Sequence, residues 1–131
     1  MTLRLPSARP APSALHRLWG RRGHAVADYV TAPALYVAAR RAGLRGTPLR
    51  WADLFVGLIL LAVTTTRTPL GVVRVVPFRW HGRAELASVA VQLALPWLAG
   101  FAREGRGRTF FLAFAAYNFL VWWATDWEAE R

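Results

Sequence analysis

The stretch HAVADY, residues 24–29, opens the first long apolar segment of the chain, and HGRAEL, residues 81–86, opens a later one. Each begins with a histidine and carries an acid four residues on, His24 with Asp28 and His81 with Glu85. A shift of 57 residues superposes the two pairs without a gap. Because a spacing of four places both side chains on one helix face, the pattern predicts a helix with a polar face that the chain uses twice.

The repeated unit is longer than one helix. A shift of 59 residues superposes Thr66 on Thr125 and Arg67 on Asp126, at the ends of two further apolar segments. The four apolar segments are residues 25–39, 51–66, 84–101 and 109–125. The sequence therefore predicts an all-α protein, a four-transmembrane-helix bundle made of two tandem helical-hairpin repeats in parallel orientation.

This repeat divides the chain into five expected parts. They are a basic, Pro- and Arg-rich N-terminal tail (1–23), a first helical hairpin (24–66), an interfacial linker (67–80), a second helical hairpin (81–127) and a short tail (128–131). The linker is expected at the interface because Pro and Gly interrupt its apolar residues.

Composition favours lipid over water or nucleic acid as the surroundings of the chain. The sequence is 55% hydrophobic with seven Trp, yet its net charge is +10 and all seventeen basic residues are Arg. The Arg residues fall at the ends of the apolar segments, which is where they anchor helices at a membrane surface, so no nucleic-acid partner is expected. The segments are slightly short for a hydrocarbon core of about 30 Å, and snorkelling Arg and interfacial Trp would complete them. The absence of Cys excludes disulfides, thiolate metal sites and thiol catalysis.

Charge in the loops predicts the orientation. Ten of the seventeen Arg residues lie in the two tails and the central connection, and seven lie in the other two loops. The positive-inside bias then predicts a multi-pass protein of the cell inner membrane with cytoplasmic N- and C-termini.

Parallel repeats gather polar groups at one membrane face. The predicted cluster contains His24, Asp28, His81, Glu85, Arg67 and Asp126. We favour a structural role, in which the acids are held by histidine, by neighbouring Arg and by Thr hydroxyls. The alternative is a binding site for a metal, another ion or a quinone, with the two His and two acids as candidate metal ligands. No HExxH or comparable signature accompanies them, so the sequence predicts no cofactor, no catalytic residue and no enzymatic activity.

A second polar contact is expected deeper in the bundle. Gln92 lies seven residues beyond Glu85, and Asn118 lies seven residues before Thr125 on the antiparallel neighbour. Equal helical rise puts both at the same depth, and we expect Gln92 and Asn118 to form an intramembrane hydrogen bond.

The segment LGVVRVVPFRWHGRAELASVAVQLALPWLAGF, residues 70–101, resembles the SPW-repeat family of small bacterial integral membrane proteins. Pro96, Trp97, Gly100 and Phe101 match the family's repeat motif, whereas Leu95 replaces its Ser and the first repeat lacks the Pro-Trp pair. The resemblance covers about residues 24–127 and implies a membrane protein without an established activity. We expect a structural or accessory module in the lipid bilayer, acting by self-association or by docking to a larger membrane complex.

Overall fold

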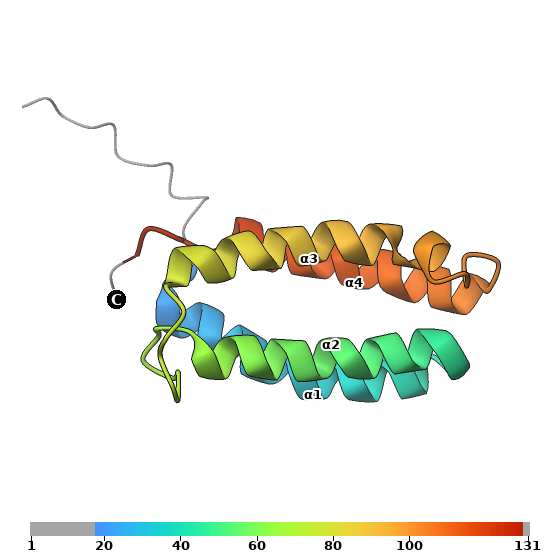
Figure 1. The fold of residues 1–131 in the computed structure, drawn as a ribbon, viewed down its shortest axis with the longest axis horizontal. Coiled ribbons are helices and arrows are strands. Elements are labelled where there is room, and N and C mark those ends of the chain that lie inside the picture. Colours follow the sequence, from blue (N-terminus) through green and yellow to red (C-terminus); the bar gives the residue numbers. More distant parts are fainter. Residues whose placement is uncertain (1–17, 130–131) are drawn as a thin grey trace, which may run out of the picture.

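The computed structural model describes residues 18–129, which form four helices. The helices α1 (Arg21–Arg41) and α2 (Gly46–Thr65) pack as one antiparallel hairpin, and α3 (Phe78–Leu98) and α4 (Gly105–Trp123) pack as a second. The two hairpins lie lengthwise against each other (Figure 1). The all-α prediction is confirmed. Most of the predicted basic tail, residues 1–17, lies outside the described residues.

The two hairpins repeat each other in detail. The first residues of α1 and α3, Arg21 and Phe78, are 57 residues apart, and so are their last residues, Arg41 and Leu98. Both helices have 21 residues. The even helices begin 59 residues apart, at Gly46 and Gly105. The sequence offsets of 57 and 59 are therefore also structural offsets.

Each odd helix ends in the same turn. Gly43 follows α1 with a φ of 72°, and Gly100 follows α3 with a φ of 79°, a left-handed conformation that glycine adopts without steric cost. The amide of Phe101 donates to the carbonyl of Pro96 at 2.8 Å, and that of Leu44 donates to Ala39 at 3.1 Å. The turn buries Phe101 and leaves Trp97 60% exposed. The Pro96–Phe101 motif therefore ends α3 and turns the chain towards α4.

The helices extend beyond the apolar segments. α3 begins at Phe78, so the last three residues of the predicted linker are helical. The preceding segment folds back, and Val76 forms a bridge with Thr66 at the end of α2. Trp19, at the equivalent position before α1, forms a bridge with Thr125 at the end of α4. Each connection before an odd helix is thus held at the end of an even helix.

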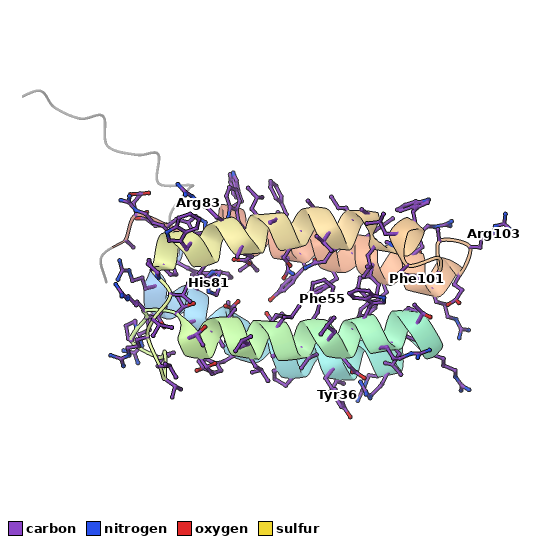
Figure 2. All side chains as sticks on the ribbon, viewed as in Figure 1. Tyr36, Phe55, His81, Arg83, Phe101 and Arg103 are labelled. Carbon is purple, nitrogen blue, oxygen red and sulfur yellow. The ribbon has the colours of Figure 1, made fainter. Side chains whose placement is uncertain are left out.

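A cluster of apolar side chains joins the hairpins at the end opposite to the bridges. Phe111 is completely buried and its ring contacts those of Phe55, Phe101 and Phe114. Figure 2 shows Phe55 and Phe101 between the two helical pairs, with His81 towards the other end. The core is therefore apolar at one end and polar at the other.

Among residues 18–129, one helix is long enough and apolar enough to cross a membrane, judged by length and composition. This helix is α2, with a mean hydropathy of 1.5 and only 22% of its apolar window buried. The other three carry Arg near their ends and place polar residues inside the bundle, which lowers their mean hydropathy. Four helices are confirmed, while a multi-pass transmembrane arrangement stays a prediction.

Truncation of the buried aromatic cluster tests this packing. Phe111→Ala is expected to destabilise the protein by about 3–5 kcal/mol, because it leaves a cavity where four rings meet. Phe119→Ala on the same helix is the control, since Phe119 is 43% exposed. The measurement is thermal unfolding of both variants in detergent, followed by circular dichroism. Equal losses of stability would contradict the described core.

Candidate functional site

The two histidines meet between the hairpins. His24 is the fourth residue of α1 and His81 is the fourth residue of α3, so the repeat places both at the same end of the bundle. Their Nε2 atoms are 3.2 Å apart, and the ring centroids are separated by 5.1 Å with the planes nearly perpendicular. Both side chains are buried, with His24 only 1% exposed. The 57-residue repeat thus becomes a direct contact between equivalent residues.

Each imidazole is held by a threonine of the opposite hairpin. His24 Nδ1 lies 2.9 Å from the hydroxyl of Thr125, and His81 Nδ1 lies 2.7 Å from that of Thr66. The Thr125 hydroxyl donates its single proton to the carbonyl of Val121, and the Thr66 hydroxyl donates to that of Ala62. Both oxygens are then left to accept, so each histidine donates from Nδ1 and turns Nε2 towards the other ring.

Two carboxylates complete the cluster around these Nε2 atoms. Asp28 Oδ2 is 3.4 Å from His24 Nε2 and 3.2 Å from His81 Nε2. Glu85 Oε2 is 3.3 Å from His24 Nε2, and it is a buried oxygen without a hydrogen-bond partner among the described residues. We call His24, Asp28, His81 and Glu85 the His–acid cluster. Its two acids, Asp28 buried and Glu85 half-buried, each turn an oxygen towards imidazole nitrogens.

An aromatic side chain covers the cluster. Trp127 stacks on His81 with ring centroids 6.0 Å apart and meets the edge of His24 at 4.6 Å. Phe78 lies beside Trp127 at 4.8 Å. On another side, a cleft of about 400 Å³ between α2 and α3 is lined by cluster members and by apolar side chains, including Phe55 and Ile59. The cluster is therefore shielded by Trp127 on one side and borders this cleft on another.

Two residues of the predicted cluster lie elsewhere. The guanidinium of Arg67 donates to the carbonyl of Arg74 at 3.3 Å, and the carboxylate of Asp126 accepts from the amide of Glu128 at 3.2 Å. The helices have ended at these positions, and the amides of Arg67 and Asp126 pair with the connections at Val76 and Trp19. The preceding residues, Thr66 and Thr125, are the ones that reach the histidines. Arg67 and Asp126 are thus corrected to roles in the connections.

Arg74 and Arg79, near this end of the bundle, also have their partners outside the cluster. Arg74 donates to the carbonyls of Gly71 and Pro69, and Arg79 pairs with Glu128. The arginine partners expected for Asp28 and Glu85 are therefore used outside the cluster, and the positive charge that these acids require must come from the histidines or from a bound cation.

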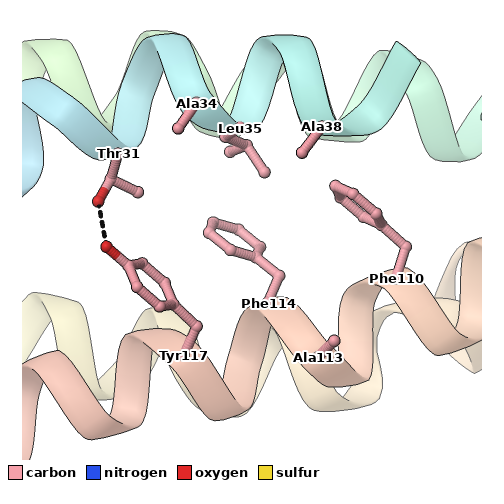
Figure 3. A pocket seen from close by; sticks show the side chains of 8 residues that line it. All are labelled: Thr31, Ala34, Leu35, Ala38, Phe110, Ala113, Phe114 and Tyr117. Carbon is pink, nitrogen blue, oxygen red and sulfur yellow. Dashed lines mark hydrogen bonds between the residues drawn. The ribbon is translucent and has the colours of Figure 1, made fainter. Parts of the chain in front are cut away.

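Polar contacts continue along the bundle. Asn118 Nδ2 donates to Gln92 Oε1 at 3.2 Å, the pair that the register of the sequence predicts, and Gln92 donates in turn to Ser88. Thr31 and Tyr117 join α1 to α4 through their hydroxyls at 2.7 Å (Figure 3). This bond lies beside a mostly apolar pocket of about 290 Å³ lined by Leu35, Phe110, Phe114 and neighbouring alanines. The pocket has no charged lining residue and is separate from the His–acid cluster.

Comparisons with protein-family models, with curated proteins and with solved structures found no match. The arrangement itself therefore carries the functional argument. Chemically, two imidazole nitrogens and the carboxylate of Asp28 that lie this close together, with a second carboxylate on Glu85 beside His24, can share protons or coordinate a cation. The three closest donors, on His24, Asp28 and His81, all lie within 4.8 Å of one another.

The closeness of Trp127 to α3 generates a prediction. A Cβ at Gly82 would lie 2.6 Å from two atoms of the Trp127 ring, so Gly82→Ala must displace the ring that covers the histidines and is expected to lower the melting temperature. Gly57→Ala is the control, because its Cβ would meet nothing within 4 Å, and a helical Gly→Ala change stabilises by about 0.5–1 kcal/mol. Thermal shifts of the same sign and size in the two variants would contradict the placement of Trp127.

Proposed function

We propose that the protein is a small membrane-embedded helical bundle that serves as a structural or accessory module, without a catalytic activity of its own. The observation that carries this proposal is an inverted distribution of polarity. Histidine, acid and amide side chains are buried inside the bundle, whereas large apolar side chains are exposed on all four helices; examples are Val30, Leu61, Leu93 and Leu120. Many exposed large apolar side chains on every helix suit a surface that contacts lipid or another protein.

Helix length supports a bilayer as the environment. The four helices have 19 to 21 residues, which corresponds to about 28–32 Å of rise and matches a hydrocarbon core of about 30 Å. The Arg side chains at the helix ends extend towards the lipid headgroups. Exposed Trp80 and Trp123 lie at the end with the His–acid cluster, and exposed Trp97 lies at the other, as in an aromatic belt.

The proposed location is the inner membrane of a bacterium, with both tails and the connection 67–77 on the cytoplasmic side. The resemblance to SPW-repeat proteins and the excess of Arg on that side support this orientation. The outer faces of the helices are the proposed sites of self-association or of docking to a larger membrane complex. Close packing between membrane helices relies on small residues, and exposed Ala90 and Ala94 on α3 provide them.

Cysteine accessibility tests the membrane proposal, because the chain has no native Cys. We expect Arg103→Cys, between α3 and α4, to react with an impermeant maleimide in spheroplasts. Val72→Cys, in the connection 67–77, is expected to react only after permeabilisation. Leu58→Cys, exposed in the middle of α2, is the control and is expected to react only in denaturing detergent, since lipid excludes the reagent.

The outcomes separate location from orientation. A protein that stays in the soluble fraction, or equal labelling of all three variants in spheroplasts, would contradict membrane embedding. Labelling of Val72→Cys in spheroplasts with protection of Arg103→Cys would contradict only the proposed cytoplasmic orientation of the termini, and not membrane embedding.

A further inference from the structure

Three donor atoms of the His–acid cluster, on His24, Asp28 and His81, are spaced like the ligands of a metal ion. Its four measured donor separations are 3.2 Å between the two histidine Nε2 atoms, 3.4 and 3.2 Å from Asp28 to these nitrogens, and 3.3 Å from Glu85 to His24. Ligands at about 2.0–2.1 Å around a tetrahedral Zn(II) ion are about 3.3–3.4 Å apart. The donor atoms of His24, Asp28 and His81 are therefore spaced as they would be around such an ion, and Glu85 lies beside one of them, His24.

We propose that the protein binds one divalent metal ion of the zinc type between its two hairpins, coordinated by His24 and His81 through Nε2 and by the carboxylate of Asp28. The carboxylate of Glu85, which lies beside His24, is the fourth ligand that completes the shell when the ion binds. Each hairpin supplies one imidazole and one carboxylate, so the ion joins the two repeats. This inference goes beyond the structural role and does not depend on which leaflet holds the cluster.

The second shell prepares both histidines for metal. Metal-binding imidazoles usually donate their other N–H to a fixed acceptor, which sets the tautomer and the ring orientation. Thr125 and Thr66 are such acceptors, because their own protons are used on helix carbonyls. Two lone pairs on Nε2 then face each other and two carboxylates. Four acceptors without a proton or a cation between them would repel one another.

Protons are the competing occupants, and the distances argue against them. A protonated imidazole bound to a carboxylate has a short N–H···O contact of about 2.7–2.9 Å, whereas the three contacts here are 3.2–3.4 Å. Two protonated rings would also bring like charges within 3.2 Å at their Nε2 atoms. A divalent ion balances both carboxylates at once and accounts for the lack of a hydrogen-bond partner at Glu85 Oε2.

The donor set selects the class of ion. Two imidazoles with two carboxylates suit borderline ions such as Zn(II), whereas Mg(II) and Ca(II) prefer sites made of oxygen alone. The net charge of the bound site is zero, which lowers the cost of burial in apolar surroundings. Three preformed protein ligands, with Glu85 as the fourth, would fill a tetrahedral shell and make a structural site.

Zinc titration of the full chain tests the proposal. The protein carries an affinity tag without histidine, is purified in detergent and is freed of metal with a chelator. We expect one Zn(II) per chain by elemental analysis after desalting, and an affinity measurable against a chromophoric chelator. Asp28→Asn should abolish stoichiometric binding. Asp53→Asn is the matched control and should bind Zn(II) as the wild type does. Asp53 forms an ion pair with Arg40 on the surface and is not part of the His–acid cluster.

Two further measurements keep the test independent of folding defects. Thr66→Val preserves side-chain shape and removes the acceptor for His81 together with the hydroxyl's own bond to the carbonyl of Ala62. It should weaken Zn(II) binding about 10–100-fold while the helical circular dichroism is retained. Co(II) in the wild type should give the intense visible absorption of a tetrahedral ion. Folded wild type that binds no stoichiometric Zn(II), a folded Asp28→Asn variant that retains it, Thr66→Val with unchanged affinity, or only the weak spectrum of octahedral Co(II) would each overturn the proposal.

Discussion

The structure depends on one reciprocal interaction, in which each buried imidazole is fixed by a threonine of the other hairpin. His24 of the first repeat bonds Thr125 of the second, and His81 of the second bonds Thr66 of the first. These bonds place the two Nε2 atoms face to face and draw Asp28 and Glu85 towards them. Because the two hairpins are copies, one set of sequence features supplies both halves of the contact.

The two hairpins are held together by different interactions at the two ends of the bundle. At one end, Phe111 and its neighbouring rings exclude polar groups and pack as an ordinary core. At the other end, a buried His–acid cluster requires compensation for its charge, since unpaired charges in an apolar interior cost several kcal/mol each. The polar pairs Gln92–Asn118 and Thr31–Tyr117 lie between the two ends. Polar side chains inside and apolar side chains outside are the arrangement expected for helices in lipid.

The sequence predicts the repeat, and the meeting of its two His–acid pairs at one end of the bundle, because His24 and Asp28 recur 57 residues later as His81 and Glu85. It placed the helix starts too late, since Arg21 and the residues 78–80 are not an apolar run although they are helical. It also assigned Arg67 and Asp126 to the cluster, because alignment shows which residues are equivalent but not that α2 already ends at Thr65 and α4 at Trp123. The cover by Trp127 depends on how the chain turns back after α4, which no periodicity encodes. The shift of 57 residues also relates Gly43 to Gly100, a signal that predicts the shared turn.

The central claim is that both buried rings donate from Nδ1, and nitrogen NMR of the three histidines reads this directly. With ¹⁵N-labelled protein in detergent, the shifts and proton couplings of the ring nitrogens distinguish the two tautomers, and His16→Asn, His24→Asn and His81→Asn variants assign the signals. The account predicts a protonated Nδ1 on His24 and His81, both without metal and after addition of Zn(II). An unprotonated Nδ1 with a protonated Nε2 on either ring would contradict it.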